Sequence, residues 1–460
     1  MKKQIILSLL IGIGTGLFAV QLPTGQNTPA NNVKTEDGKI ISAVLPSSEI
    51  FETSVGNLTS SKNKEVEFYK NGALKKIHAE ENLSFKTSGL VLKLKSPYEF
   101  HESGELKGAN IAYVPETIII QTSAGALEAI KNAKITFFKD GRAESFYVSQ
   151  HNKELPFNLK GGYKDVSLIS FYESGNVKQL TPNFSNLYKP LGIQLKANAE
   201  IEFYDSKRVK SFIPADDAVL KTDSASFKFV NSEKCELFES GMIKRCVFNC
   251  SYSNFSMGGK SFAYGLMADY LKITNQNANA IFEMYEDGSL KKVESLKVGS
   301  YLEEFPVVVQ EGEKIIAAKS VQYTEKGKTF QIRFFEPALV AAEYADEPRG
   351  WKGSLDIMNA NFFSNVNSRT DSTYYRIWKC FYPENSEEFY MIGTEIDEED
   401  SDYFYTKTTT GIMTVKNNKV TEVKSVDNIN ADSELIFDDA GKIKSCELND
   451  KSESIYNSRY

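Results

Sequence analysis

The chain has few of the residues that enzymes most often use for proton transfer and metal binding. Its 460 residues include only three histidines, His78, His101 and His151, and no two of them have the spacing of a metal-ligand pair. Neither a Gly-x-Ser-x-Gly elbow nor a His-Glu-x-x-His motif occurs. A Gly-Gly-Lys-Ser run at residues 258–261 ends like a phosphate loop but lacks the upstream glycine of that motif. The sequence therefore predicts a non-catalytic protein without a cofactor or a metal.

An excess of positive charge is also absent. The formal net charge is -7 at pH 7, and contacts with nucleic-acid phosphates need a basic face. The same charge argues against adhesion to an anionic lipid surface. Helical patterns are scarce as well, with one short and weak candidate at residues 124–131. We expect an all-β protein that has no nucleic-acid partner.

The apolar run near the N-terminus has the layout of a secretory signal. Lys2 and Lys3 precede apolar residues 5–20, and Ala19 ends a plausible cleavage site. The run is shorter than the roughly 20 apolar residues that span a bilayer, and no cysteine for a lipid anchor lies near it. We expect a signal peptide at residues 1–19 and a disordered leader at 20–32. Export to the periplasm, the cell surface or the medium follows, with no transmembrane span after signal cleavage.

One short phrase recurs along most of the chain: an apolar strand ending in Phe-Tyr, a turn with glycine, then an aliphatic residue and lysine. The clearest copies occupy residues 66–75, 169–178 and 435–444. The turn glycines are Gly72, Gly104, Gly141, Gly175, Gly241, Gly288 and Gly441, with Lys207 in the equivalent place of one copy and weaker copies at Gly38 and Gly327. Early copies follow one another at intervals of about 34 residues, which predicts stacked copies of one supersecondary unit.

The pattern around each turn predicts a β-hairpin and its register. Numbered from the turn glycine, positions -6 and +5 are apolar in every copy, and Glu67 at -5 has Lys76 at +4 as its partner. A tight turn of two residues pairs these positions directly. It also pairs -3 with +2 and -4 with +3, so that both faces carry apolar pairs. We therefore expect one covered face and a second, partly covered face on which lysine stems lie over aromatic rings.

A second glycine lies between successive turns, flanked by short alternating runs. These glycines are Gly56, Gly89, Gly125, Gly162, Gly192 and Gly259. Each repeat thus consists of two hairpins, or four short strands. The predicted fold is all-β, with repeated antiparallel hairpins stacked in an elongated twisted or curved sheet. A β-propeller and a groove-forming curved sheet are the alternatives.

The phrase Phe-Tyr-x-x-Gly-x-Leu-Lys is similar to the MORN-type repeat, especially its bacterial variant with a Tyr-Tyr-x-x-Gly-Lys-Leu core. The similarity covers residues 33–330 and 405–448. MORN units are shorter than these and carry a second fixed glycine, which this chain places irregularly. The resemblance implies stacked antiparallel hairpins that serve as scaffolds or binding surfaces.

A column of tyrosine and lysine side chains, at -3 and +3 of successive copies, is the candidate binding surface. It comprises Tyr69, Lys75, Tyr172, Lys178, Tyr204 and Lys210. Such a column suits stacking on sugars or seating a protein, although it also suits simple coverage of the sheet. We expect an exported, non-catalytic scaffold or binding surface in the cell envelope, with an unknown envelope protein or glycan as partner. A periplasmic lipid-binding sheet is the first alternative.

Five cysteines leave at least one unpaired. Cys235 and Cys246 occupy the facing -6 and +5 positions of one hairpin, so an exported protein can join them by a disulfide. Cys250 is a competing partner for Cys246. The alternative is that both are small core residues.

The repeat lapses between residues 336 and 404. We expect an irregular insert there, between a hairpin array at 33–335 and C-terminal repeat hairpins and a tail at 405–460. Nine carboxylates and no lysine or arginine occur at residues 384–402. This run is a solvated loop or a calcium site, since clustered carboxylate oxygens bind hard cations. A hydrolase with its site in this insert is the second functional alternative.

Overall fold

In a computed structural model, the chain is all-β over the residues that the structure describes. These are residues 19–25, 27–29, 33–87, 89–123, 125–149, 159–160, 166–182, 186–188, 190–216, 218–221, 226–230, 233–250, 254–263, 279–296, 306–311, 314–340, 366, 373–399 and 405–448. The chain divides into two compact units, which are described separately. Unit 1 comprises 1–157, 161–184 and 202–207, and unit 2 comprises the remainder.

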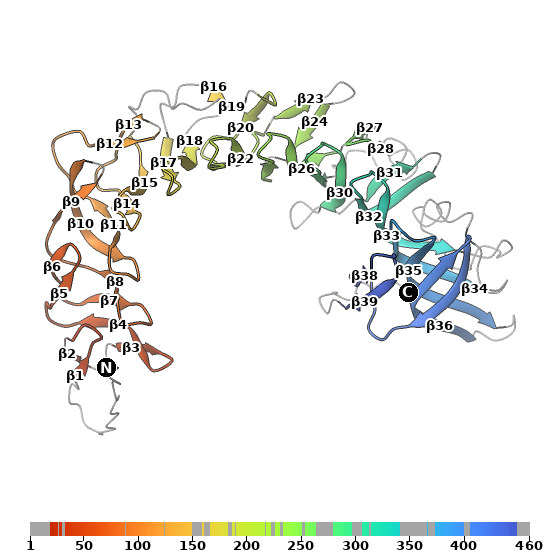
Figure 1. Ribbon diagram of the computed structural model, residues 1–460, viewed down its shortest axis with the longest axis horizontal. Coiled ribbons are helices and arrows are strands. Elements are labelled where there is room, and N and C mark those ends of the chain that lie inside the picture. Colours follow the sequence, from red (N-terminus) through yellow and green to blue (C-terminus); the bar gives the residue numbers. More distant parts are fainter. Residues whose placement is uncertain are drawn as a thin grey trace. The chain divides into compact units, whose positions relative to one another are not determined.

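The main sheet of unit 1 is a series of antiparallel hairpins in chain order (Figure 1). Its successive strands are β3 (Val33–Glu36), β4 (Lys39–Leu45), β7 (Lys64–Phe68), β8 (Leu74–Ile77), β10 (Leu90–Phe100), β11 (Leu106–Ile111), β14 (Lys134–Phe137), β15 (Ala143–Tyr147), β17 (Val166–Phe171) and β18 (Val177–Pro182). Each hairpin also pairs with the next, as β8 does with β10 and β11 with β14. Because copies share one sheet, the prediction of stacked hairpins is confirmed, and separate propeller blades do not describe it.

The predicted register is confirmed away from the turns. Position -6 pairs with +5 in Ile135–Phe146 and Ile169–Leu180, and Glu67 pairs with Lys76. The charged pairs Glu236–Arg245 and Glu283–Lys292 of unit 2 are likewise cross-strand partners.

The turn itself differs from the two-residue turn that was predicted. The Tyr69 amide donates to the Ala73 carbonyl at 2.8 Å, and the Gly72 amide donates to the Tyr69 carbonyl at 2.9 Å. These bonds define a three-residue loop that ends in a glycine bulge, with Gly72 at a φ of 89°. The same two bonds recur at Gly104, Gly141, Gly175, Gly241, Gly288, Gly327 and Gly441. Lys207 takes the glycine position with a φ of 69°.

A second bulge, which leaves Lys75 at +3 without a cross-strand partner, corrects the predicted faces of the hairpin. It pairs Phe68 at -4 with Leu74 at +2, so the expected pairings of -3 with +2 and of -4 with +3 are wrong. Val66, Phe68 and Ile77 are buried, while the intervening Glu67 is only half-buried. Each hairpin therefore has one apolar face and one polar face, because the extra residue restores the alternation that a two-residue turn would have broken.

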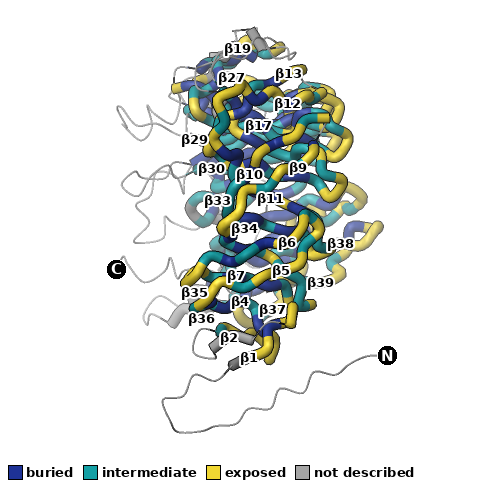
Figure 2. Tube along the Cα trace, turned by 90° about the vertical axis from the view of Figure 1, so that its left-hand side faces the viewer, coloured by how far each residue is buried: buried dark blue, intermediate teal, exposed yellow. Residues whose placement is uncertain are grey.

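A second row of small hairpins lies against the main sheet of unit 1, as two hairpins per repeat predict. These are β5 (Ile50–Thr53) with β6 (Gly56–Thr59), β9 (Leu83–Thr87) with the start of β10, and β12 (Ile119–Thr122) with β13 (Gly125–Glu128). Their inward side chains, such as Phe51 and Leu58, are 0% exposed. Figure 2 shows exposed residues along β5 and β6. The core of unit 1 thus lies between the two rows.

Unit 2 continues the pattern and then lengthens its strands. Its main order is β22 (Val209–Phe212), β25 (Cys235–Leu237), β26 (Ile243–Asn249), β29 (Asn279–Met284), β30 (Leu290–Leu296), β32 (Lys314–Tyr323), β33 (Thr329–Val340), β34 (Thr373–Phe381), β35 (Glu388–Glu399), β36 (Tyr405–Lys416) and β37 (Lys419–Ser425). Shorter strands accompany it in three groups. They are the three-stranded sheet of β16 (Leu159–Lys160), β19 (Asn186–Tyr188) and β20 (Ile193–Leu195); the pair β23 (Val219–Lys221) and β24 (Ser226–Phe229); and the three strands β27 (Asn254–Met257), β28 (Lys260–Ala263) and β31 (Val307–Glu311).

The segment 336–404 is more regular than predicted. It contains β34 and β35, whose cross-strand pairing extends from Thr373–Asp397 to Phe381–Tyr390. The C-terminal repeat hairpin, β38 (Glu434–Phe437) and β39 (Ile443–Glu447), forms its own two-stranded sheet. Its Leu435 and Phe437 pack with Phe381 and Tyr390 of the long strands.

The leader predicted to be disordered at 20–32 is ordered in part. Strands β1 (Ala19–Gln21) and β2 (Asn27–Pro29) pair with each other. Leu22 between them is 2% exposed, and a side chain at Gly72 would contact Pro23. The predicted signal peptide at 1–19 lies outside the described residues, apart from Ala19.

Candidate functional site

The structure places the predicted tyrosine–lysine column at the turn end of successive hairpins. Tyr69, Tyr172 and Tyr204 are half-buried, whereas Lys75, Lys178 and Lys210 are exposed. The lysine of one predicted pair lies over its ring, with the Lys178 Nζ 5.9 Å from the Tyr172 centroid. Lys291 lies 6.0 Å from the Tyr285 ring in an equivalent copy. The expected contact of lysine with aromatic rings is therefore present in these two copies.

The hydroxyls of this column have a role that the sequence did not predict. The Tyr69 Oη donates to the carbonyl of Phe100 at 2.8 Å, and the Tyr172 Oη donates to the carbonyl of Phe203 at 2.7 Å. Tyr285 donates to Tyr323 at 2.8 Å in the same way. In each case position -3 of one copy bonds the carbonyl at position -4 of the next. These bonds hold each ring in a fixed orientation.

Histidine substitutes for tyrosine in this role at one turn. His101 occupies position -3, and its Nε2 lies 2.9 Å from the carbonyl oxygen of Phe137, at position -4 of the next copy. Because a carbonyl oxygen only accepts, the Nε2 atom must carry the hydrogen. His101 is thus a structural residue. His78 is half-buried and its pKa is lowered by burial, while His151 lies outside the described residues.

The small hairpins add a second set of ties in unit 1. The Ser54 hydroxyl donates to the Gly104 carbonyl at 2.9 Å, and the Thr87 hydroxyl donates to the Gly141 carbonyl at 2.7 Å. Ser123 bonds the carbonyl of Gly175 in the same manner. Each donor stands two residues before a small-hairpin glycine, at Gly56, Gly89 and Gly125. The row of turns is therefore fixed from both sides.

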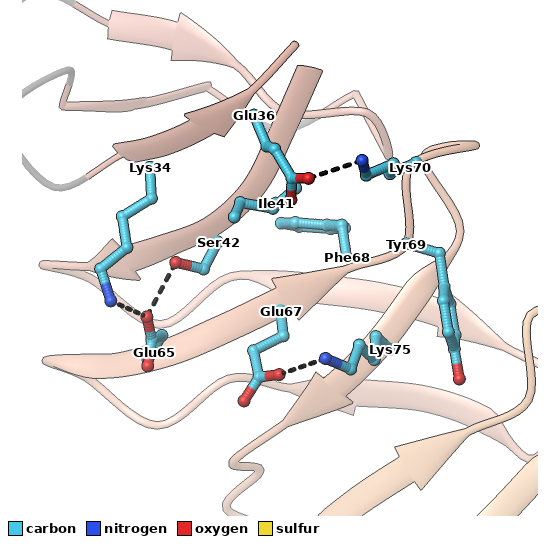
Figure 3. A pocket seen from close by; sticks show the side chains of 10 residues that line it. All are labelled: Lys34, Glu36, Ile41, Ser42, Glu65, Glu67, Phe68, Tyr69, Lys70 and Lys75. Atoms are coloured by element: carbon cyan, nitrogen blue, oxygen red, sulfur yellow. Dashed lines mark hydrogen bonds and ion pairs between the residues drawn. The ribbon is translucent and has the colours of Figure 1, made fainter. Parts of the chain in front are cut away.

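The first copy forms an open dish of about 450 Å³, which includes Tyr69 and Lys75 of the predicted surface (Figure 3). Strands β3, β4, β7 and β8 position it, and we call it the dish. Its lining consists of Lys34, Glu36, Ile41, Ser42, Glu65, Glu67, Phe68, Tyr69, Lys70 and Lys75. In Figure 3, Ile41 and Phe68 lie between the polar pairs above and below them.

Three carboxylates and three ammonium groups line the dish, and each is paired with one of opposite charge. The Lys34 Nζ lies 2.9 Å from Glu65, the Lys70 Nζ 2.5 Å from Glu36, and the Lys75 Nζ 3.1 Å from Glu67. Lys70 also reaches Asp37 at 3.1 Å, and Lys76 lies 3.6 Å from Glu67. The dish is consequently rich in charged groups while its lining is close to neutral overall.

Hydrogen bonds stabilise the charged forms of the Lys34–Glu65 pair. The hydrogen bond from Lys34 lowers the pKa of Glu65, and a 2.7 Å bond from the buried Ser42 hydroxyl lowers it further. The same bond to Glu65 raises the pKa of Lys34. Hydrogen bonds to Glu36 and Asp37 raise the pKa of Lys70. These shifts favour the charged forms of Lys34, Glu65 and Lys70.

Sequence reasoning missed half of this site. Lys34, Glu36 and Ser42 belong to the weak copy around Gly38, whose turn has only two residues, Asp37 and Gly38. The alternation of lysine and glutamate at residues 34 and 36 was the available signal. It is typical of an edge strand and identifies no ligand by itself.

The predicted disulfide residues face each other but are free thiols in the structure. Cys235 and Cys246 continue the register of Glu236–Arg245 and are each 1% exposed. Burial raises the pKa of both thiols, and the charges of Cys235 and Cys250 raise that of Cys246 further. Cys446 packs against the core cluster that contains Phe381. Cys380 directly precedes Phe381 on β34, and its side chain therefore points to the opposite face of the sheet. The pairing therefore stays a prediction.

The acidic run predicted at residues 384–402 does not form a single cluster in its described part. Of the acidic run, Glu384 pairs with Lys326 at 3.4 Å, and Glu388 pairs with Lys442 at 2.6 Å. Residues 400–404 lie outside the described part. Within the described ranges, no three His, Cys, Asp or Glu side chains form a group that could hold a metal ion. Nor does any helix in those ranges have the length and apolar character needed to cross a bilayer.

No protein-family model matches the chain, and no curated protein matches it. A mutant form of the Photorhabdus luminescens Tc holotoxin pore is one solved structure with some similarity. The two are 9% identical with a TM-score of 0.12, and the match covers 91% of this chain and 20% of that chain. A TM-score of this size carries no argument about the fold or function of this chain.

Proposed function

We propose that the chain is an exported, non-catalytic repeat protein that provides a binding surface or scaffold in the cell envelope, with a protein or a glycan as partner. The observation that supports the proposal is the double fixation of the turn row. The Tyr69 and Tyr172 rings at -3 are each held by a carbonyl of the next copy, and turn carbonyls are held by the small hairpins. Interactions of this kind pre-organise side chains for recognition, which lowers the entropy cost of binding.

The exposed lysines stand beside these fixed rings at matching positions. Lys75 and Lys178 of unit 1 are both exposed at +3, in the same hairpin as a half-buried tyrosine. A partner with its own repeat therefore meets the same pair of groups several times. Repeated weak contacts of this type raise the overall affinity by multivalency.

Two observations disfavour the lipid alternative for unit 1. The apolar face of its main sheet is covered by the chain's own small hairpins, whose Phe51 and Leu127 are 0% and 1% exposed. The dish is lined by ion pairs rather than by apolar groups. The hydrolase alternative gains no specific support from β34 and β35, where Glu388 is engaged by Lys416 and Lys442.

Affinity capture from an envelope extract, with a glycan array in parallel, tests the proposal. We expect binding by the full chain and at least a tenfold loss when Tyr69, Lys75, Tyr172 and Lys178 are all replaced by alanine. A variant with the exposed Lys62 and Lys86 replaced by alanine loses the same two positive charges and is the control for altered surface charge. Equal binding by both variants, or no binding in either format, would contradict the proposal.

A further inference from the structure

We propose that the dish in the first copy binds a neutral saccharide. The inference rests on the proposed function and specifies the ligand class of this one site. It is carried by the combination of paired charges, a fixed aromatic ring and a shallow apolar floor within one cavity. Each of these three features limits the class of ligand that the dish can bind.

The charge balance of the lining argues against a strongly charged ligand. Lys34, Lys70 and Lys75 are matched by Glu65, Glu36 and Glu67 at distances of 2.5 to 3.1 Å. A polyanion would have to displace carboxylates, and a polycation would have to displace lysines. Neither gains the net attraction that charged ligands obtain from a cleft of a single sign.

The same pairs are well suited to a ligand with many hydroxyl groups. Each carboxylate has about four lone-pair positions and each ammonium group has three hydrogens, so the ion pairs leave hydrogen-bonding capacity unused. Hydrogen bonds to charged groups are stronger than bonds between neutral groups, contributing about 1.5–3 kcal/mol each. A sugar hydroxyl both donates and accepts, and it can therefore join a carboxylate and an ammonium group at once.

The Tyr69 ring supplies a flat contact that is already oriented. Its hydroxyl is bound to the Phe100 carbonyl at 2.8 Å, and burial raises its pKa, so the phenol stays neutral. A ring held in this way keeps a surface for the C–H groups of a sugar. Ile41 and Phe68 extend the apolar part of the lining between the ion pairs.

The size of the cavity fits this class of ligand. At about 450 Å³ the dish lies within the range of roughly 300–1,000 Å³ that is usual for small-molecule sites. Its open form and exposed rim, where Lys34 is 71% and Lys70 is 54% exposed, leave room for a chain to continue beyond the site. An internal unit of an oligosaccharide is therefore accommodated as well as a single sugar.

A series of tetrasaccharides that differ in charge tests the inference. The probes are neutral cellotetraose and chitotetraose, cationic deacetylated chitotetraose, and anionic tetragalacturonate, studied with the full chain by ligand-observed NMR and titration calorimetry. We expect at least one neutral probe to bind, with an affinity that changes less than twofold between 50 and 300 mM salt. The two charged probes should bind at least tenfold more weakly.

Matched variants locate the binding. Tyr69→Ala should reduce the affinity at least tenfold, and Glu67→Gln at least threefold. Tyr285→Ala is the control, because it removes the same ring and the same inter-copy bond from a hairpin of unit 2. An equal loss with Tyr285→Ala would place binding elsewhere and overturn the inference.

The possible failures are distinguishable. Preference for either charged probe, or a steep dependence on salt, overturns the neutral-sugar class. If no saccharide binds but an envelope protein is captured and lost with the four-residue variant, this inference fails while the proposed function stands. If neither saccharide nor protein binds, both fail.

Discussion

Tyr69 and Phe100 lie 31 positions apart in the sequence, and the hydroxyl of the first donates a 2.8 Å hydrogen bond to the backbone carbonyl of the second. The bond joins two successive copies of the repeat. Tyr69→Phe should lower stability by about 1 kcal/mol, the usual contribution of one neutral hydrogen bond. Chemical denaturation followed by fluorescence measures the change. A variant with unchanged midpoint would show that the bond contributes nothing to the folded state.

The same geometry predicts two stabilising substitutions. Phe138 and Phe238 stand at position -3, where other copies have tyrosine, and they lack the hydroxyl. Phe138→Tyr and Phe238→Tyr should each raise stability by up to about 1 kcal/mol by bonding the next copy at Phe171 and Met284. Phe137→Tyr, at a fully buried -4 position, is the control and should destabilise the protein. Loss of stability in both -3 variants would contradict this account of the turn row.

Two glycines of unit 2 are required by close backbone approach. Gly393 and Gly411 pair directly across β35 and β36. A Cβ atom at Gly393 would overlap the Arg376 carbonyl oxygen, and one at Gly411 would overlap that of Lys424. Gly393→Ala should therefore cost about 3 kcal/mol or more, because a carbonyl of the sheet cannot easily move. Gly259→Ala, which has no atom within 4 Å of the new Cβ, should cost only about 1 kcal/mol of backbone strain. Comparable thermal midpoints for the two variants would refute the prediction.

An ion pair between the buried Lys379 and the 46% exposed Glu434 holds the C-terminal hairpin onto the long strands. The Lys379 side chain is 2% exposed, and its Nζ lies 2.5 Å from Glu434 and 3.0 Å from the Ser433 carbonyl. Burial lowers the pKa of Lys379, while the bond to Glu434 opposes that effect. Glu434→Gln should destabilise the hairpin by about 1–3 kcal/mol, since the buried Lys379 ammonium loses its carboxylate partner and keeps only the Ser433 carbonyl.

The double variant Lys379→Met/Glu434→Gln should recover much of that loss, because it removes the charge as well. Limited proteolysis at residues 426–433 is the measurement, with faster cleavage expected for the single variant. A double variant that is cleaved faster than the single one would show that the pair itself provides the stability.

Tyr98 should make the folded protein less stable at high pH. It is fully buried, and its hydroxyl donates to the Glu81 carbonyl at 2.7 Å and accepts from the Leu83 amide at 3.2 Å. Burial raises its pKa from 10.0 to about 12. The folded state therefore favours the neutral phenol, so this contribution to stability is complete below pH 10 and is lost as the pH rises to about 12.

Tyr98→Phe should be less stable than the parent at pH 8, by about 1–3 kcal/mol, because the Leu83 amide loses its acceptor. The difference should shrink between pH 10 and 12, as the parent protein loses the contribution of the neutral phenol. Urea denaturation at a series of pH values measures it. A constant difference across that range would contradict the assignment.

The facing cysteines of unit 2 predict a disulfide that forms only during folding. Burial raises the pKa of Cys235 and Cys246, which makes the reactive thiolate scarce in the folded protein. Refolding with oxidised glutathione should yield a Cys235–Cys246 bridge, seen by peptide mass spectrometry, while the folded reduced protein should resist the same oxidant. Cys250→Ser should leave the bridge intact. A bridge between Cys246 and Cys250 would contradict the register.

The sequence predicted the hairpins and most of their register because apolar side chains alternate on both arms of each turn. Ile135–Phe146 and Glu67–Lys76 pair as expected. The bulge at +3 was missed, since the arms have the same pattern whether the loop has two or three residues. For the same reason, the sequence did not predict that each hairpin has one apolar face and one polar face.

The hydrogen bonds between copies could not be predicted from the sequence for a different reason. Tyr69 was singled out as an exposed binding residue, but the acceptor of its hydroxyl is a backbone carbonyl, which leaves no mark on the sequence. Only part of the dish could be predicted from the sequence, because Lys34 and Glu36 have the pattern of a short edge strand. That β3 pairs with β4, and β4 in turn with β7, depends on the fold.

The hydroxyl bridges of unit 1 skip a neighbour: Ser54 passes over the turn of Gly72 to reach Gly104, and Thr87 passes over Gly104 to reach Gly141. Because these hydrogen bonds overlap along the chain, the repeats cannot be treated as independent, interchangeable units. Excising a single repeat would sever bridges that belong to the copies on either side, so lengthening or shortening the protein without loss requires changes that respect the overlap.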